Sequence, residues 1–220
     1  RARGDLDDAG ELLEGVRTHH GETSGWLEEA ARHAFASDEF DRAEGLLRQR
    51  AERYPSASAE VAIGRFLLDR GRLNEAEKIA KALMSSDGEL LTVMMFAGDV
   101  ARALGQLDLA RGYYLAIVDA RGEHPSGLQM MAELSFEDGE ERPAREFLRR
   151  VIYAYDQGGY PLTAAAAQRI VRLSEDLEDL DTAERFRALA DVELGKARAK
   201  LAESIWTALA KAGALRPPVE

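Results

Sequence analysis

The chain has 220 residues, of which 45% are apolar, and carries a formal net charge of −11 at pH 7. This acidic balance argues against nucleic acid or an anionic membrane surface as the main partner, because long-range repulsion opposes both. The absence of cysteine excludes disulfides, thiolate catalysis and cysteine zinc sites, and the longest apolar run, residues 90–98, is too short to span a bilayer.

Apolar residues recur at helical spacing through the first half of the chain and predict a series of short helices. The expected helices cover residues 5–18, 26–36, 39–53, 57–70, 73–84, 89–104 and 107–120. His19-His20-Gly21 is expected to end the first of them, and Thr23 and Ser24 are suitable N-cap residues for the second. Residues 85–88 are expected to form a loop that also caps the next helix.

In the second half, residues 126–138 and 141–155 are predicted to form a further helix pair, with Pro143 in a first turn, where its missing N–H costs little. Residues 156–161 form either a longer loop or part of a lengthened helix. One long helix is predicted over residues 181–212, although Gly195 costs it about 1 kcal/mol relative to alanine. Ile205 and Trp206 could cap the last apolar face; alternatively, this helix projects and docks on a partner or on itself.

A six-residue pattern links these helices: glycine, an apolar residue two positions on, and alanine three positions later. It occurs at residues 4–9, 71–76 and 105–110, and looser copies begin at Asp38, Gly139 and Glu178. The closing alanines lie 34, 33, 34, 34 and 39 residues apart, at Ala9, Ala43, Ala76, Ala110, Ala144 and Ala183. Glycine permits a tight turn between two helices, and alanine lets them approach closely. A period of this size is the signature of a helical-repeat array.

With these features the chain resembles the tetratricopeptide repeat family. The family's mid-helix glycine is matched by Gly64 and Gly98 and its closing proline by Pro55, while Trp26 only approximates its early tryptophan. The family's first-helix aromatic is replaced throughout, by Ala34, Leu67, Ala101 and Ser135.

The resemblance implies an all-α, right-handed α-solenoid of about five and a half repeats over residues 1–195. A capping helix over 196–214, continuous with the last repeat helix, and a tail or linker over 215–220 would complete one elongated domain. Because the chain starts without methionine and its first repeat has only a second helix, we expect a fragment of a larger or a processed protein. The many arginines and alanines are compatible with a bacterial source.

In such a solenoid the first helices of successive repeats line a concave groove, which the resemblance makes the expected binding site for a protein or peptide partner. The inward positions carry Glu28, Arg32 and Phe35; Val61, Arg65 and Leu68; Met95, Asp99 and Arg102; Gln129, Glu133 and Phe136; and Gln168, Arg172 and Glu175. Arg32 and Arg65 share a register that Asp99 and Glu133 occupy later, so the groove is expected to be basic early and acidic late. The alternative is that these charges only pair with one another across adjacent repeats, where exposed pairs contribute about 0–1 kcal/mol.

No catalytic, cofactor or metal motif is recognisable, so we expect no enzymatic activity, no cofactor and no metal site. The histidine pair is interpreted as interacting favourably, when protonated, with the dipole at a helix C-terminus. A solvated helix face, interleaved with glutamates, is expected at Arg142, Arg145, Arg149 and Arg150. The expected function is a protein-interaction scaffold, most simply cytoplasmic, with the periplasm as the other compartment considered. A regulatory or sensor repeat domain of a larger enzyme or transcription regulator, and a homodimer formed through the C-terminal helix, are the alternatives.

Overall fold

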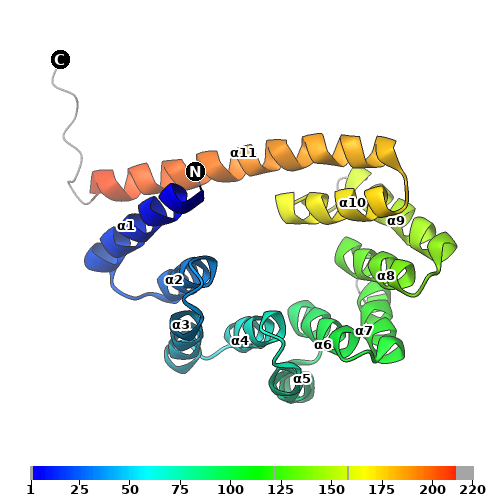
Figure 1. Cartoon of the computed structure of the whole chain (residues 1–220), viewed down its shortest axis with the longest axis horizontal. Coiled ribbons are helices and arrows are strands. Elements are labelled where there is room, and N and C mark those ends of the chain that lie inside the picture. The colour runs from blue at the N-terminus through cyan, green and yellow to red at the C-terminus, as the bar shows by residue number, and fades with distance from the viewer. Residues whose placement is uncertain (1, 121, 158, 212–220) are drawn as a thin grey trace. The chain divides into compact units, whose positions relative to one another are not determined.

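The computed structural model describes the backbone of residues 2–120, 122–157 and 159–211, and the side chains of residues 9–120, 122–157 and 159–196. All regular structure in these ranges is α-helical (Figure 1). The helices are α1 Ala2–His20, α2 Ser24–Ala36, α3 Phe40–Arg53, α4 Ala57–Asp69, α5 Leu73–Asp87, α6 Leu91–Ala103, α7 Leu107–Ala120, α8 Pro125–Glu137, α9 Glu141–Asp156, α10 Ala164–Asp176 and α11 Leu180–Lys211. The chain divides into two compact units, Arg1–Tyr113 and Tyr114–Glu220, and each is considered by itself.

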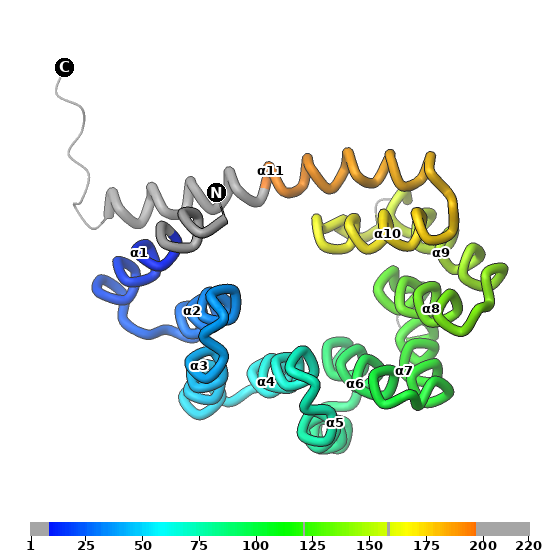
Figure 2. Tube along the Cα trace, viewed as in Figure 1, coloured from blue at the N-terminus to red at the C-terminus, as the bar shows by residue number. Residues whose placement is uncertain are grey.

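Two kinds of helix alternate along the chain. We call α2, α4, α6, α8 and α10 the A helices, and α1, α3, α5, α7, α9 and α11 the B helices. Every A helix has 13 residues, and each connects to the following B helix through a turn of a few residues (Figure 2). The fold is therefore the all-α array of helix-turn-helix repeats that the sequence predicts.

The turns between A and B helices use the left-handed backbone conformation that the glycine pattern predicts. Gly71, Gly105 and Gly139 have φ values of 70°, 72° and 77°, where glycine avoids the steric cost of a Cβ atom. The two copies that begin without glycine adopt the same conformation, since φ is 60° at Asp38 and 57° at Glu178. Gly4 is the exception, because α1 runs through it as continuous helix, so the turn predicted there is wrong.

Small residues at the repeat positions permit close packing of the helices. Ala43, Ala76, Ala110 and Ala144 are fully buried, as expected where two helices meet. Gly64 allows the Phe96 ring of α6 to lie against α4, because a Cβ atom at residue 64 would be 2.1 Å from Phe96 Cζ. At the start of the array the indole nitrogen of Trp26 donates to the carbonyl oxygen of Leu13 (2.8 Å), which ties α2 to α1.

Three sequence expectations concerned helix ends. The predicted loop over residues 85–88 is wrong, because α5 continues to Asp87. The hydroxyls of Ser85 and Ser86 donate to carbonyl oxygens four residues back, at Lys81 and Ala82, and so are satisfied within the helix. The predicted side-chain cap is also wrong, because α6 begins after Leu90 without one, whereas the Thr23 cap of α2 is confirmed by its hydrogen bond from the Trp26 amide.

The 39-residue interval before Ala183 combines both explanations that the sequence left open. Compared with the preceding repeat, α9 is two residues longer than α7, and the segment before α10 is three residues longer than the segment before α8. The long last helix is confirmed, because α11 passes through Gly195 without a break. The proposed cap formed by Ile205 and Trp206, and the linker at 215–220, lie outside the side chains that the structure describes.

Candidate partner-binding surface

The A helices present three recurring positions, and the first of them contributes less exposed surface than expected. Val61 is 6% exposed and belongs to the core of the first unit. Gln129 is 4% exposed, and its amide nitrogen donates to the carbonyl oxygen of Ala166 (3.3 Å). Both residues were predicted to face a partner. Their side chains instead pack between helices of their own unit.

At the same position in α2, Glu28 takes part in a network that the sequence did not reveal. Its carboxylate accepts from Arg32 on its own helix and pairs with Arg50 of α3 at 2.9 Å. Arg50 is 8% exposed, its Nε donates to Ser24 Oγ (3.1 Å), and its Nη1 has no hydrogen-bond partner among the described residues. Glu28 is therefore held in place by a buried guanidinium.

The sequence contains a signal for this network. Arg50 lies seven residues after its repeat alanine, and the matching residues in the later repeats are buried and apolar: Leu83, Ile117, Val151 and Ala190. A charged residue in that register indicates a buried pair, although its partner is 22 positions away.

Arg32 and Arg65 occupy the second position in neighbouring repeats of the first unit and are both exposed. Arg32 is bound by two glutamates of α2, Glu28 and Glu29. Arg65 forms no ion pair within the part of the chain that the structure describes. Desolvation raises the pKa of Asp69, one turn further along α4, and the charge of Arg65 offsets that rise only in part.

Apolar groups accompany these charges in the first unit. Phe35 is 36% exposed and makes edge contacts with Phe40 (5.4 Å between ring centroids) and Phe66 (5.9 Å). The Arg70 guanidinium lies 3.8 Å from the centroid of Phe40. Leu68 and Met95 are partly exposed. We call Arg32, Phe35, Arg65, Leu68 and Met95 the A-helix face of the first unit. This face combines aromatic and aliphatic surface with two arginines.

In the second unit, the A-helix charges are bound more tightly. Both carboxylate oxygens of Glu133 accept from Arg169 of α10, at 2.8 and 2.6 Å, and Arg169 also contacts the sulfur of Met130. Arg169 was not among the predicted site residues. Arg172, which was, is exposed, and Phe136 is partly buried against the core of the unit.

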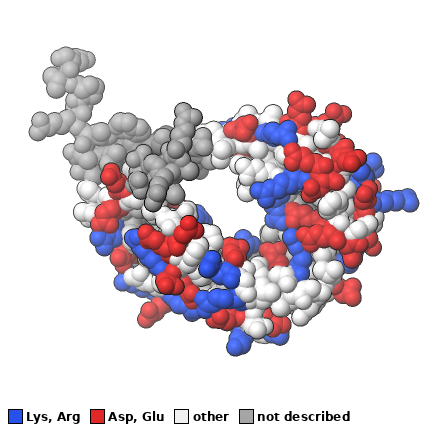
Figure 3. Space-filling view, in the orientation of Figure 1, with Lys and Arg blue, Asp and Glu red and all other residues white. Residues whose placement is uncertain are grey.

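Basic and acidic side chains are interspersed over the visible surface (Figure 3), as the many ion pairs require. No group of three or more potential metal ligands occurs within the described residues. None of the described helices is both long and apolar enough to cross a membrane.

The paired helices, the left-handed turns and the buried alanines define a helical-repeat array of the tetratricopeptide type. Similar solved structures have the same fold. A thermophilic tetratricopeptide protein from Thermus thermophilus, TTC0263, is 18% identical over 88% of this chain and 100% of its own (TM-score 0.62). A tetratricopeptide repeat protein from Parabacteroides merdae is 14% identical over 87% of this chain and 73% of its own (TM-score 0.65). PilW, a type IV pilus biogenesis factor, is 18% identical over 88% of each chain (TM-score 0.57).

No family model and no curated protein matches the sequence. The similarity to these structures therefore concerns the fold.

Proposed function

We propose that this chain is a protein-interaction scaffold that binds a peptide or partner protein through its A-helix face, without catalytic residues of its own. The observation that carries the proposal is the A-helix face of the first unit. There Arg65 is exposed without an ion pair to any residue that the structure describes, three positions before the partly exposed Leu68, and the exposed Phe35 contacts Phe66, which adjoins Arg65 on α4. Charged groups of this kind orient a partner, and apolar groups supply contact area.

In the first unit the proposed site comprises Glu28, Arg32, Phe35, Arg65, Leu68, Met95, Asp99 and Arg102. In the second unit, taken by itself, the proposed contact residues on the A helices are Glu133, Phe136 and Arg172. Its two early arginines favour an acidic part of the partner, and Asp99 and Glu133 favour a basic part. Fixing Glu28 between Arg32 and Arg50 limits the side-chain entropy that binding would cost.

The test is affinity capture from lysate of the source cell with the parent chain and two charge-reversal variants. Arg32→Glu with Arg65→Glu alters the A-helix face. Arg42→Glu with Arg48→Glu makes the same charge change on α3, a B helix. A partner retained by the parent and by the α3 variant, but lost by the A-helix variant, supports the proposal. Equal capture by all three proteins overturns the A-helix assignment.

A second function is favoured by α1. Val16 is 40% exposed and Leu12 is 46% exposed, whereas the residues that match Val16 in all later repeats are buried: Arg50, Leu83, Ile117, Val151 and Ala190. This apolar face suits contact with a neighbouring segment, as in a regulatory repeat domain of a larger enzyme or transcription regulator. Failure of the parent chain to capture any partner would favour that function.

A further inference from the structure

The outer face of α9 carries arginines at two positions where most of the other B helices have acidic residues. Arg142 lies in the first turn of α9, one position after Glu141. The matching residues in other repeats are acidic or neutral: Asp41, Asn74, Asp108 and Asp181. A cation in the first turn of a helix is opposed by the helix dipole, so Arg142 costs stability where the matching aspartates contribute it.

A second position, about one turn later, also differs from most of the other B helices. The position of Arg145 carries a glutamate in three other B helices, namely Glu44, Glu77 and Glu184, and an arginine, Arg111, in α7. Arg149 follows one turn later, at a position that is also basic in α3 (Arg48) and α5 (Lys81). Tyr153 follows Arg149 by one more turn, with 63% of its surface exposed. We call Arg142, Arg145 and Arg149 the α9 arginine stripe.

The contacts of these arginines separate them from Arg150, with which the sequence analysis grouped them. Arg150 donates to Glu123 at 2.8 Å, and its guanidinium lies 5.2 Å from the ring centroid of Phe147. Within the stripe, by contrast, the nearest carboxylates are 3.7 Å away for Arg145 and 3.9 Å away for Arg149, beyond ordinary hydrogen-bond distance. Arg142 makes no ion pair with any residue that the structure describes.

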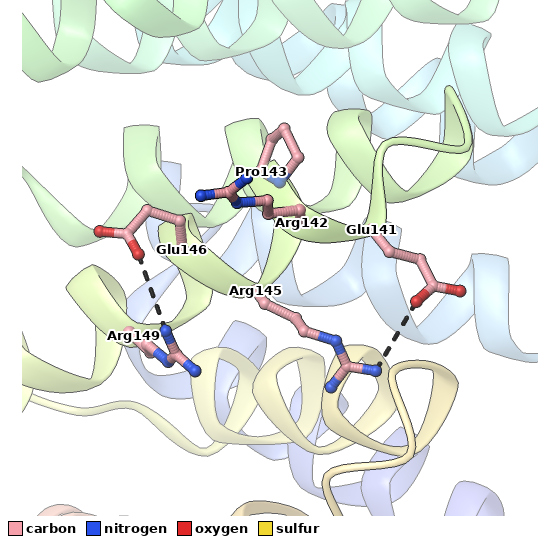
Figure 4. Close-up of a pocket in the computed structure, with 6 residues that line it drawn as sticks. All are labelled: Glu141, Arg142, Pro143, Arg145, Glu146 and Arg149. Carbon is pink, nitrogen blue, oxygen red and sulfur yellow. Dashed lines mark ion pairs between the residues drawn. The ribbon is translucent and has the colours of Figure 1, made fainter.

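The three guanidinium groups border one hollow. Its volume is about 730 Å³, and it is lined by the stripe together with Glu141, Pro143 and Glu146. Figure 4 shows Arg145 extended toward Glu141 and Arg149 toward Glu146, while Arg142 lies beside Pro143 and no ion pair joins it to either carboxylate. The donors that point into the hollow are therefore only weakly satisfied by the chain itself.

We propose that the α9 arginine stripe is a second docking site, which binds an acidic segment of a partner protein. Charge complementarity selects this occupant: guanidinium groups pair bidentately with carboxylates, and the exposed Tyr153 ring offers apolar contact at the end of the stripe. A nucleic acid fits less well, because the chain carries a net charge of −11 and Glu141 and Glu146 flank the arginines.

The direct test is fluorescence anisotropy with a labelled peptide of repeated Glu-Glu-Leu triplets, compared with the same peptide carrying Gln in place of Glu. The parent should bind the glutamate peptide and lose affinity as salt rises. Arg142→Glu with Arg149→Glu should weaken binding by about tenfold or more, since it removes two charge pairs and adds two repulsive ones. The matched α3 variant, Arg42→Glu with Arg48→Glu, should bind within about twofold of the parent.

A melting curve separates this effect from misfolding. Arg142→Glu alone replaces a cation by an anion at a helix N-terminus, so it should leave the melting temperature unchanged or raise it while weakening peptide binding. Equal affinity for the glutamate and glutamine peptides, or an unchanged affinity in the α9 variant, would overturn the proposal. The proposal would also be overturned if a labelled single-stranded DNA bound the parent more tightly than the glutamate peptide does and the α9 variant lost that binding.

This proposal is independent of the A-helix face. Arg32→Glu with Arg65→Glu should leave glutamate-peptide binding at α9 intact, so the two sites can fail separately. An equal loss of peptide binding in the A-helix variant would assign the peptide to that face and overturn the α9 site.

Discussion

Replacing Arg50 by methionine should stabilise the first unit. The guanidinium is buried at a register where the other repeats have apolar side chains, and its Nη1 lacks a hydrogen-bond partner among the described residues. A buried, unsatisfied donor costs about 1–3 kcal/mol, and apolar replacement of a buried pair is often stabilising by a similar amount. Glu28 remains 31% exposed at its side chain and keeps Arg32 as a partner, so the replacement leaves no buried carboxylate unpaired.

We therefore expect Arg50→Met to raise the free energy of unfolding by about 1–2 kcal/mol, measured by urea denaturation of the whole chain. Glu28→Ala should act in the opposite direction, lowering it by about 1–3 kcal/mol, because it removes the counter-ion of a buried cation. Combining the two changes should abolish most of the cost of Glu28→Ala. An Arg50→Met protein that is less stable than the parent by 1 kcal/mol or more would refute this reasoning.

Three further changes test the packing, turn and charge arguments. Gly64→Ala should lower the free energy of unfolding by about 1–3 kcal/mol through overpacking, whereas Gly45→Ala, where a Cβ atom meets nothing within 4 Å, should raise it. Thermal melts in which Gly64→Ala is the more stable variant would contradict the close contact between α4 and Phe96. Asp38→Gly should stabilise the turn by about 1 kcal/mol, because it removes a left-handed residue with a side chain; a less stable variant in the same melts would contradict this. Burial raises the pKa of Glu44, but hydrogen bonds from two arginines outweigh it and hold the pKa below its ordinary value of 4.5. The stability that Glu44 contributes is thus present above pH 4.5 and is lost as the pH falls through its lower folded pKa. Urea denaturation at a series of pH values should show a smaller loss of unfolding free energy on acidification for Glu44→Gln than for the parent. Parallel curves of unfolding free energy against pH would count against this.

The sequence predicted the repeat architecture because the same requirement recurs in every unit. A left-handed turn followed by a close helix contact demands glycine and alanine at fixed spacing, and these appear at Gly71 and Ala76 and again at Gly105 and Ala110. Asp38 shows the limit of that signal. The flanking helices impose a left-handed backbone there, although the residue is not glycine.

The surface was less predictable, because register alone does not determine whether a side chain is exposed. Val61 and Gln129 share their register with Glu28, yet they are buried by packing. The pairing of Glu133 with Arg169 depends on how α8 and α10 lie against each other, which single-sequence spacing does not specify. The arginines at residues 142 and 145, where most other B helices are acidic, are by contrast visible in the sequence once the B helices are aligned on their alanines.

We propose above all that a partner occupies the A-helix face of the first unit. Hydroxyl-radical footprinting of the chain, alone and with a captured partner, measures this directly at oxidisable side chains. We expect Phe35 and Met95, both at proposed contact positions, to become protected when the partner binds, while the exposed Tyr54, which follows the last residue of α3, keeps its reactivity. Unchanged oxidation of Phe35 and Met95 in a complex that demonstrably forms would contradict the claim.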